Sequence, residues 1–292
     1  MTTFLVTGAN GKLGRHVTQL LLDAQKRENG VGTVIAASRD PSKLADLEAK
    51  GAQTRRADFD DPQSLTTAFA DVDRVLIIST DALGVPGKRL TQHQNAVAAA
   101  KSAGAEIVYT SMPQPDNSAV LFAPDHLGTE QAIKASGAAY TIVRDAWYQE
   151  NLLHSLPAAF ASGKWYSSAG DGATPYISHA DCARALAAAL SKPSSNQTFT
   201  ITGPELLTTK QVAALASDIV GKPLEVVDVS DEQLAGGLKH AGLPEVVIPT
   251  FVSFETAARL GHFATKTDDY EALTGQKPEP SRDFFVANKA AF

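Results

Sequence analysis

A glycine-rich stretch near the start of the chain limits the possible folds more than any other feature. Its three glycines follow a short apolar segment over 3–7 and open an amphipathic pattern over 12–22. These patterns predict a turn from a strand into a helix. Because glycines leave no side chain above the first helical amides, a pyrophosphate can contact the N–H groups at the positive end of the helix dipole. We therefore predict a dinucleotide site formed by Gly8, Ala9, Asn10, Gly11, Lys12 and Leu13.

The spacing of these glycines, G-x-x-G-x-x-G, differs from the G-x-G-x-x-G of the usual dinucleotide fingerprint. A tight strand-to-helix turn that binds no ligand is the alternative interpretation. The context favours a binding site, because the motif follows the first predicted strand, opens a helix and precedes a second strand over 33–37.

The residues after the second strand bear on which dinucleotide is bound. Asp40 and Pro41 are typical of the N-cap and first residue of a helix. An acidic residue here normally binds the ribose of NAD, whereas a nearby arginine accommodates the 2′-phosphate of NADP. With Asp40 occupied as a cap, Arg39 and Lys43 are left for a phosphate, which favours NADPH. The alternative is that Arg39 is an ordinary solvated cation.

Alternating strand and helix patterns continue to residue 144 and predict an α/β fold with a doubly wound, parallel, Rossmann-type sheet. Further strands are expected over 53–57, 73–80, 106–112 and 140–144. Open α/β sheets bind ligands at the carboxyl ends of their strands. We therefore assign Asp58 and Phe59 to the adenine end of the cofactor, and Ser79, Thr80 and Ser111 to its middle and nicotinamide end. Phe59 could equally be a core residue.

Composition excludes several classes of protein. The 292 residues include 26 Lys and Arg against 32 Asp and Glu, a net charge of −6, so a nucleic-acid surface is not indicated. A single cysteine, Cys182, excludes an internal disulfide and fits a reducing compartment. The first strand leaves no space for a signal peptide, and no apolar run is long enough for a membrane span. We expect a cytoplasmic protein with a small-molecule substrate, no metal and, as one assembly to consider, a homodimer.

Several motifs carry a family resemblance. T-G-x-x-G-x-x-G at the first strand, S-R-D-P at the second, R-A-D-F-D at the third and Y-T-S at the fifth resemble the NmrA-like atypical short-chain dehydrogenase/reductases. The R-x-x-W-Y-x-x-N motif over 144–151 and the segment 169–183 are similar to type 2 NAD(P)H:quinone oxidoreductases. The resemblance covers essentially the whole chain. It implies reduction of a quinone by direct hydride transfer from NADPH, without flavin.

One departure from typical short-chain dehydrogenases affects the mechanism. Those enzymes place Tyr-x-x-x-Lys on the helix after the fifth strand, where the tyrosine exchanges a proton with a carbonyl or alcohol. Here that helix reads Asp125-His126-Leu127-Gly128-Thr129-Glu130 and lacks both residues. Reduction of a quinone needs no strong acid, because the oxyanion formed is a stabilised phenolate, so positioning over the nicotinamide could suffice.

Two residues are weaker catalytic candidates. His126 could supply a proton because its ordinary pKa lies near neutrality, although a partly exposed helix residue is the alternative. Tyr148 is the second candidate. His93 could also approach the site, but a packed histidine is the more common situation.

The segment after the sixth strand provides the predicted acceptor site. Trp147, Tyr148 and Asn151 offer flat apolar faces and hydrogen-bonding groups suited to an aromatic acceptor, although core packing is the alternative. We predict a dinucleotide-binding domain over 1–145, to which 172–203 returns. Residues 146–171 and 204–292 are expected to form a smaller, mixed α/β substrate-binding lobe.

The sequence is compatible with two other functions. NmrA-like proteins include sensors that bind a dinucleotide without turnover, and the absent Tyr–Lys pair is compatible with such a role. A reductase or isomerase of another conjugated acceptor is also compatible with the pattern.

Overall fold

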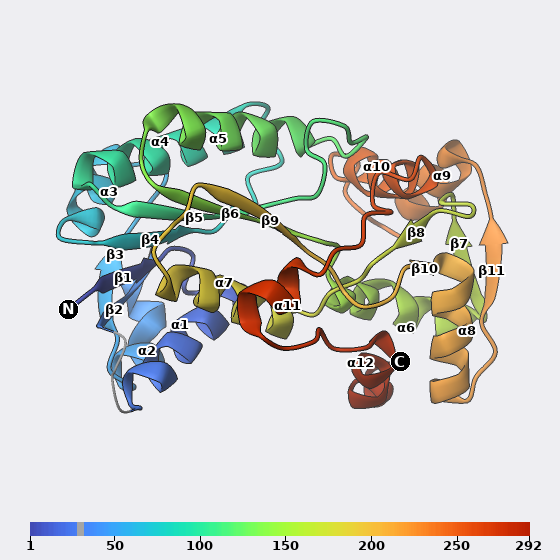
Figure 1. Cartoon of the computed structure of the whole chain (residues 1–292). Coiled ribbons are helices and arrows are strands. Elements are labelled where there is room, and N and C mark those ends of the chain that lie inside the picture. Colours follow the sequence, from blue (N-terminus) through green and yellow to red (C-terminus); the bar gives the residue numbers. More distant parts are fainter. Residues whose placement is uncertain (28–31) are drawn as a thin grey trace.

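The structure, a computed structural model that describes residues 1–27 and 32–292, contains a seven-stranded parallel sheet (Figure 1). Its strand order is β3-β2-β1-β4-β5-β6-β9. The strands are β1 (Thr3–Val6), β2 (Thr33–Ser38), β3 (Gln53–Arg56), β4 (Arg74–Ile77), β5 (Glu106–Ser111), β6 (Tyr140–Asp145) and β9 (Gln197–Ile201). The predicted Rossmann-type α/β fold is confirmed.

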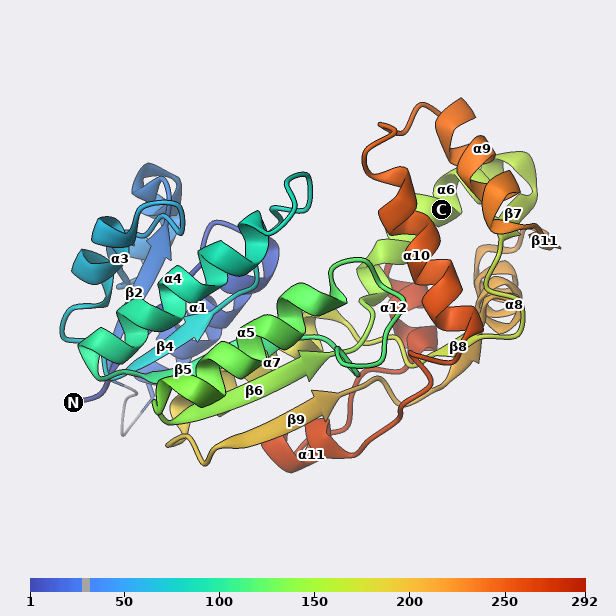
Figure 2. The ribbon, with the colours of Figure 1, turned by 90° about the horizontal axis from the view of Figure 1, so that it is seen from above.

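Helices cover both faces of this sheet. One face carries α1 (Lys12–Gln25), α7 (His179–Ser191) and α11 (Asp269–Thr274); the other carries α3 (Pro62–Phe69), α4 (Lys88–Ala103) and α5 (Ala123–Ser136). Figure 2 shows α4 and α5 on the near face. Because side chains alternate along a strand, Phe4 and Val6 of β1 pack on the α1 side, whereas Leu5 packs on the α3 side. The core therefore forms two apolar layers around the sheet.

The chain reverses its direction of winding at β1, which pairs with β2 on one side and β4 on the other. In open α/β sheets this arrangement leaves a crevice at the carboxyl ends of the two halves. A short segment, η1 (Pro41–Leu44) followed by α2 (Ala45–Glu48), borders it beyond β2.

The strand predicted over 73–80 is shorter than expected. Strand β4 ends at Ile77, because the backbone N–H groups that follow donate to side-chain hydroxyls and not to a neighbouring strand. Ile78 N donates to Thr7 Oγ1 at 2.9 Å, and Ser79 N donates to Thr110 Oγ1 at 2.8 Å. Ser79 and Thr80 therefore lie in a loop rather than in the strand.

A smaller group of elements lies beyond the carboxyl ends of the strands, and in Figure 2 β6 and β9 point toward it. It contains a parallel pair, β7 with β11, and an antiparallel pair, β8 with β10. These elements are η2 (Gln149–Asn151), α6 (Leu152–Ser162), β7 (Lys164–Ser167), β8 (Ala173–Thr174), β10 (Leu207–Thr208), α8 (Thr209–Val220), β11 (Glu225–Asp228), α9 (Asp231–His240), α10 (Ile248–Arg259), α12 (Ser281–Ala287) and η3 (Lys289–Ala291).

The C-terminal part of the chain does not pack wholly in this smaller group. Tyr270 and Leu273 of α11 are buried in the core under α1 and α7, so α11 lies with the sheet although its sequence falls within the predicted lobe. Among the residues described, no helix has the length and apolar character needed to cross a bilayer. The same residues include no cluster of three or more His, Cys, Asp or Glu arranged to hold a metal ion.

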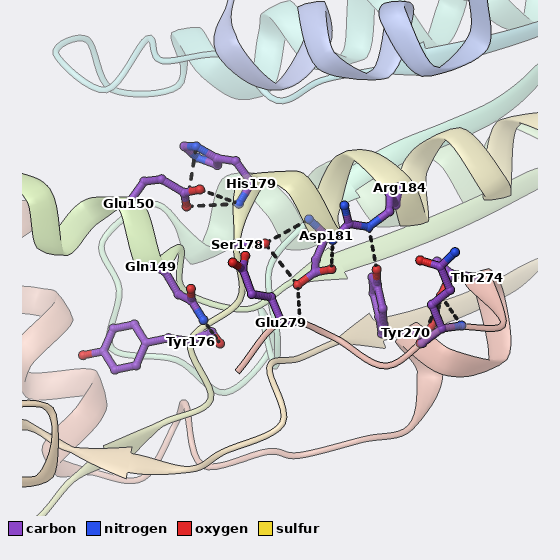
Figure 3. Close-up of polar contacts among 11 residues, drawn as sticks. Gln149, Glu150, Tyr176, Ser178, His179, Asp181, Arg184, Tyr270, Thr274 and Glu279 are labelled. Carbon is purple, nitrogen blue, oxygen red and sulfur yellow. Dashed lines mark hydrogen bonds and ion pairs between the residues drawn. The ribbon is translucent and has the colours of Figure 1, made fainter. Parts of the chain in front are cut away.

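A polar network joins the C-terminal segment to the start of α7 (Figure 3). The Asp181 carboxylate is fully buried and accepts hydrogen bonds from Ser178 Oγ at 3.0 Å and Glu279 N at 2.8 Å. It also pairs with Arg184 at 2.5 Å, and Arg184 Nε donates to the Tyr270 hydroxyl at 3.0 Å. One carboxylate thus connects α7, α11 and the segment that follows α11.

Replacing Asp181 with alanine is expected to lower the free energy of unfolding by about 2–3 kcal/mol, because the Ser178 hydroxyl and Glu279 amide lose a buried acceptor. Chemical denaturation measures this change. The control is Asp218→Ala, which removes an exposed carboxylate paired with Arg282 and should leave stability unchanged. Equal, small effects of both substitutions would contradict the assigned role.

Candidate dinucleotide-binding and active site

The glycine turn has a backbone that requires its glycines. Gly8 adopts a left-handed φ of +60°, which glycine tolerates far better than other residues. A Cβ atom at Gly14 would lie 2.5 Å from Gly8 O, so only glycine lets α1 approach the turn this closely. The N-cap of α1 is Gly11, and no side chain among the described residues caps this helix end. The first amides of α1 can therefore bind an anion.

A cleft of about 760 Å³ opens at this turn, within the range of small-molecule sites. Most of the predicted cofactor residues line it: Gly8, Asn10, Gly11, Arg39, Lys43, Asp58, Phe59, Ser79 and Thr80. The residues present thus fit a dinucleotide, with glycine amides at one end and cations beyond β2.

The remaining predicted cofactor residues do not line the cleft. Ala9 is buried and donates its N–H to Ala37 O at 3.0 Å, which ties the turn to β2. Lys12 and Leu13 lie in the first turn of α1, where Leu13 packs against the core.

At the end of β2, Asp40 caps the following helical segment, η1, as predicted. The Asp40 carboxylate accepts hydrogen bonds from Ser42 N at 3.1 Å and Ser42 Oγ at 2.6 Å, and the hydroxyl bond is the main reason why the pKa of Asp40 lies below its ordinary value. The predicted N-cap is therefore confirmed. Arg39 is exposed at the cleft and makes no ion pair with any residue that the structure describes. Lys43 Nζ lies 4.0 Å from Asp40 Oδ2.

The end of β3 forms another part of the cleft wall. Asp58 accepts hydrogen bonds from Arg56 Nη2 at 3.2 Å and from Asp60 N at 3.1 Å. Phe59 belongs to the core cluster beneath α3 and also lines the cleft, so its core role is confirmed and its place at the adenine end stays a prediction.

The loop after β4 is held in place through Thr80. Its N–H donates to His93 Nε2 at 2.9 Å, and its hydroxyl donates to Gln92 Oε1 at 2.8 Å. Its carbonyl accepts from Arg89 Nε at 2.6 Å. His93 is fully buried, and burial followed by the nearby Arg89 charge lowers its pKa to about 3. His93 is therefore a neutral acceptor that orients this loop.

His126 lies in a buried network and not at the surface of the helix. Its Nε2 accepts from Arg89 Nη2 at 2.9 Å, so the ring proton is assigned to Nδ1, which lies 3.0 Å from the Tyr109 hydroxyl. Burial, and secondarily the Arg89 charge, lowers the pKa of His126 well below its ordinary value. This geometry does not support His126 as a proton donor, and its burial also excludes the partly exposed alternative.

Ser111 also lies outside the cleft lining and is hydrogen-bonded to a carboxylate that the sequence reasoning did not single out. Its hydroxyl donates to Glu130 Oε1 at 2.7 Å. Glu130 also pairs with Arg144, at 2.8 Å to Nε and 2.7 Å to Nη2. His126 and Glu130 stand at the i, i+4 spacing of the missing Tyr–Lys pair, but both face polar partners inside the protein.

The predicted acceptor residues lie in different surroundings. Trp147 packs against Phe254 of α10, with ring centroids 4.2 Å apart, and against Phe263 at 5.9 Å. Phe122 joins the same aromatic cluster, 5.7 Å from Phe254. These three phenylalanines were missed because no local pattern predicts that segments so distant in the sequence meet. Trp147 thus belongs to an apolar, aromatic cluster.

Tyr148 packs on the opposite side from Trp147, against α7. Its hydroxyl donates to Asp145 Oδ2 at 2.9 Å, and its ring lies 4.4 Å from that of His179. Burial raises the pKa of Asp145 to about 7 and raises that of Tyr148 well above its ordinary value, so Tyr148 is a poor acid at neutral pH. Asn151 is partly exposed and precedes α6. The structure therefore does not bring Trp147 and Tyr148 onto one surface.

Comparisons with known proteins agree with this geometry. An NAD(P)H-binding family model matches residues 8–193. Quinone oxidoreductase 2 of Escherichia coli is 34% identical over 92% of this chain and 93% of its own. Its crystal structure with NADPH superimposes with a TM-score of 0.91 at 31% identity, covering 97% of this chain and 99% of that one.

Two further relatives reduce other kinds of molecule, as their names state. Citrobacter sp. triphenylmethane reductase has a TM-score of 0.90 at 30% identity and covers 99% of this chain and 100% of its own. An NAD(P)H azoreductase of Xenophilus azovorans is 28% identical over 99% of this chain and 98% of its own. The chain belongs to the NAD(P)H-binding, NmrA-like family of oxidoreductases.

Proposed function

We propose that the protein is an NADPH-dependent quinone reductase that works by direct hydride transfer, without flavin or metal. The observation that carries this proposal is the link, through Arg89, between the cleft and an aromatic cluster. Thr80 lines the cleft and accepts a hydrogen bond from Arg89, whose guanidinium lies 4.9 Å from the Phe122 ring centroid. Phe122 belongs to the cluster around Trp147. The E. coli quinone oxidoreductase 2 relative supports the choice of acceptor.

Each part of the site has a proposed role in this reaction. NADPH supplies the hydride when bound. The first backbone amides of α1, after the Gly11 N-cap, bind the pyrophosphate, and Arg39 with Lys43 binds the 2′-phosphate. Asp58, Phe59, Ser79 and Thr80 border the remaining cofactor, while Trp147 belongs to the substrate side. The final proton comes from solvent, since neither His126 nor Tyr148 is placed as an acid.

A direct test is NADPH consumption on addition of a small benzoquinone, compared with an enone, an azo dye and a triphenylmethane dye. We expect rapid oxidation with the benzoquinone. Oxidation only with another acceptor would overturn the quinone assignment. Tight NADPH binding without consumption in any mixture would favour the sensor function instead.

A further inference from the structure

Arg89, in the first turn of α4, is a buried cation without a carboxylate partner among the described residues. Only 4% of its surface is exposed. Nε donates to Thr80 O at 2.6 Å and Nη2 to His126 Nε2 at 2.9 Å, whereas Nη1 is shielded from solvent and has no hydrogen-bond partner in the described chain. Burial of an uncompensated charge is costly, by several kcal/mol. Such a group is retained more readily where a ligand brings the opposite charge.

The position of Arg89 indicates which kind of ligand would bring this negative charge. One of its partners, Thr80, lines the cofactor cleft, and its planar guanidinium stands over Phe122 of the aromatic cluster. Phe122 connects through Phe254 to Trp147. The starts of α4 and α5 lie on the side of the sheet that faces α10 (Figure 2). Arg89 does not itself line the cleft; it lies directly behind Thr80, between the cleft and the aromatic cluster proposed for the acceptor.

The neighbouring groups do not neutralise this charge. The titratable and charged groups that act on Arg89 come from several elements: His93 from α4, Tyr109 from β5, Asp125 and His126 from α5, Asp81 from the loop after β4, and Tyr148 from the segment after β6. Burial keeps both histidines neutral, and burial raises the pKa of Tyr109 further above neutrality. Asp81 and Asp125 attract the guanidinium only from beyond ion-pair distance, within the part of the chain described.

We propose that the Arg89 guanidinium supplies the positive charge that stabilises the oxyanion of the reduced acceptor. This inference rests on the proposed function. A quinone that accepts hydride gains two electrons and one proton, so it becomes a hydroquinone monoanion as the cofactor is oxidised, and water then provides the second proton. A fixed cation in a low-dielectric site lowers the energy of that anion, which replaces the missing acid of the Tyr–Lys pair.

A binding experiment tests this inference without turnover. 4-Nitrophenol serves as an analogue of the hydroquinone anion, and its absorbance reports ionisation when it is bound to the protein saturated with NADP⁺. We expect the wild type to bind the phenolate about tenfold more tightly than the phenol, which lowers the pKa of bound nitrophenol by about one unit. Arg89→Met should abolish this shift, and Arg89→Lys should retain most of it.

Arg55→Met is the matched control, because Arg55 also donates to backbone carbonyls, of Ala68 and Ala70, but lies at the edge strand β3 away from the aromatic cluster. It should leave the nitrophenol shift unchanged. Thermal melting checks that each variant is folded. If Arg89→Met does not fold, two other results still test the inference. Loss of the nitrophenol shift in folded Arg89→Lys, or absence of the shift in the wild type, would overturn it.

Activity gives a second, separable readout. In single-turnover reduction of a benzoquinone by protein saturated with NADPH, Arg89→Met should lower the rate constant about 100-fold. Equal nitrophenol shifts in the wild type and Arg89→Met, or no binding of nitrophenol to the wild type, would overturn the inference. A wild type that lowers the nitrophenol pKa through Arg89 but reduces no quinone would refute the proposed function alone.

Discussion

Replacing Gly14 with alanine is expected to weaken NADPH binding about 100-fold. The new Cβ atom would lie 2.5 Å from Gly8 O and 3.1 Å from Ala9 Cα, so the glycine turn must move away from α1. Loss of two hydrogen bonds to a charged pyrophosphate, at about 1.5 kcal/mol each, gives this factor. Titration of NADPH fluorescence measures the affinity.

The control for this prediction is Gly237→Ala in α9. A Cβ atom there meets nothing within 4 Å, and Gly237 lies in a helix, so alanine should stabilise the protein by about 0.5–1 kcal/mol and leave NADPH affinity unchanged. Equal NADPH affinities of Gly14→Ala and the wild type would show that close packing of α1 on the turn is not needed for binding.

Arg39→Ala is expected to weaken NADPH binding about 10- to 100-fold and to leave NADH binding unchanged, because only NADPH carries the 2′-phosphate. The effect should be this large because Asp40 is held by Ser42 and does not compete for the guanidinium. Stopped-flow oxidation of each coenzyme by a quinone measures the preference directly.

Arg282→Ala in α12 is the matched control, since it removes an exposed arginine whose partner, Asp218, lies in the smaller group of elements. It should change neither coenzyme's affinity. Equal use of NADPH and NADH by the wild type would contradict the assignment of Arg39.

Features set by neighbouring residues were predicted well from the sequence. Helix caps are of this kind: Asp61 caps α3 through Ser64 N at 3.2 Å, and Thr208 and Ser230 form capping boxes with Gln211 and Gln233. Such contacts span three residues, so their spacing is visible in the chain. The glycine turn and the order of strands and helices up to β6 were predictable for the same reason, because each rests on local periodicity and turn chemistry.

Features that depend on distant residues could not be predicted. The Glu130–Arg144 pair that holds Ser111, and the contact between Trp147 and Phe254, join different elements after the chain has folded. Arg89 shows the limit most clearly. In the sequence it is one of two adjacent cations at a helix start, and the packing of α4 against α5 makes it a buried charge.

Hydride transfer from NADPH directly to a quinone is the central claim, and an anaerobic single-turnover experiment tests it most directly. The wild-type protein is mixed with a small benzoquinone and NADPH that is either unlabelled or dideuterated at C4 of the nicotinamide. We predict one phase in which NADPH loss equals hydroquinone formation, with a primary deuterium isotope effect on its rate constant and no flavin absorbance. NADPH that stays bound and reduced in the presence of saturating benzoquinone would contradict the claim.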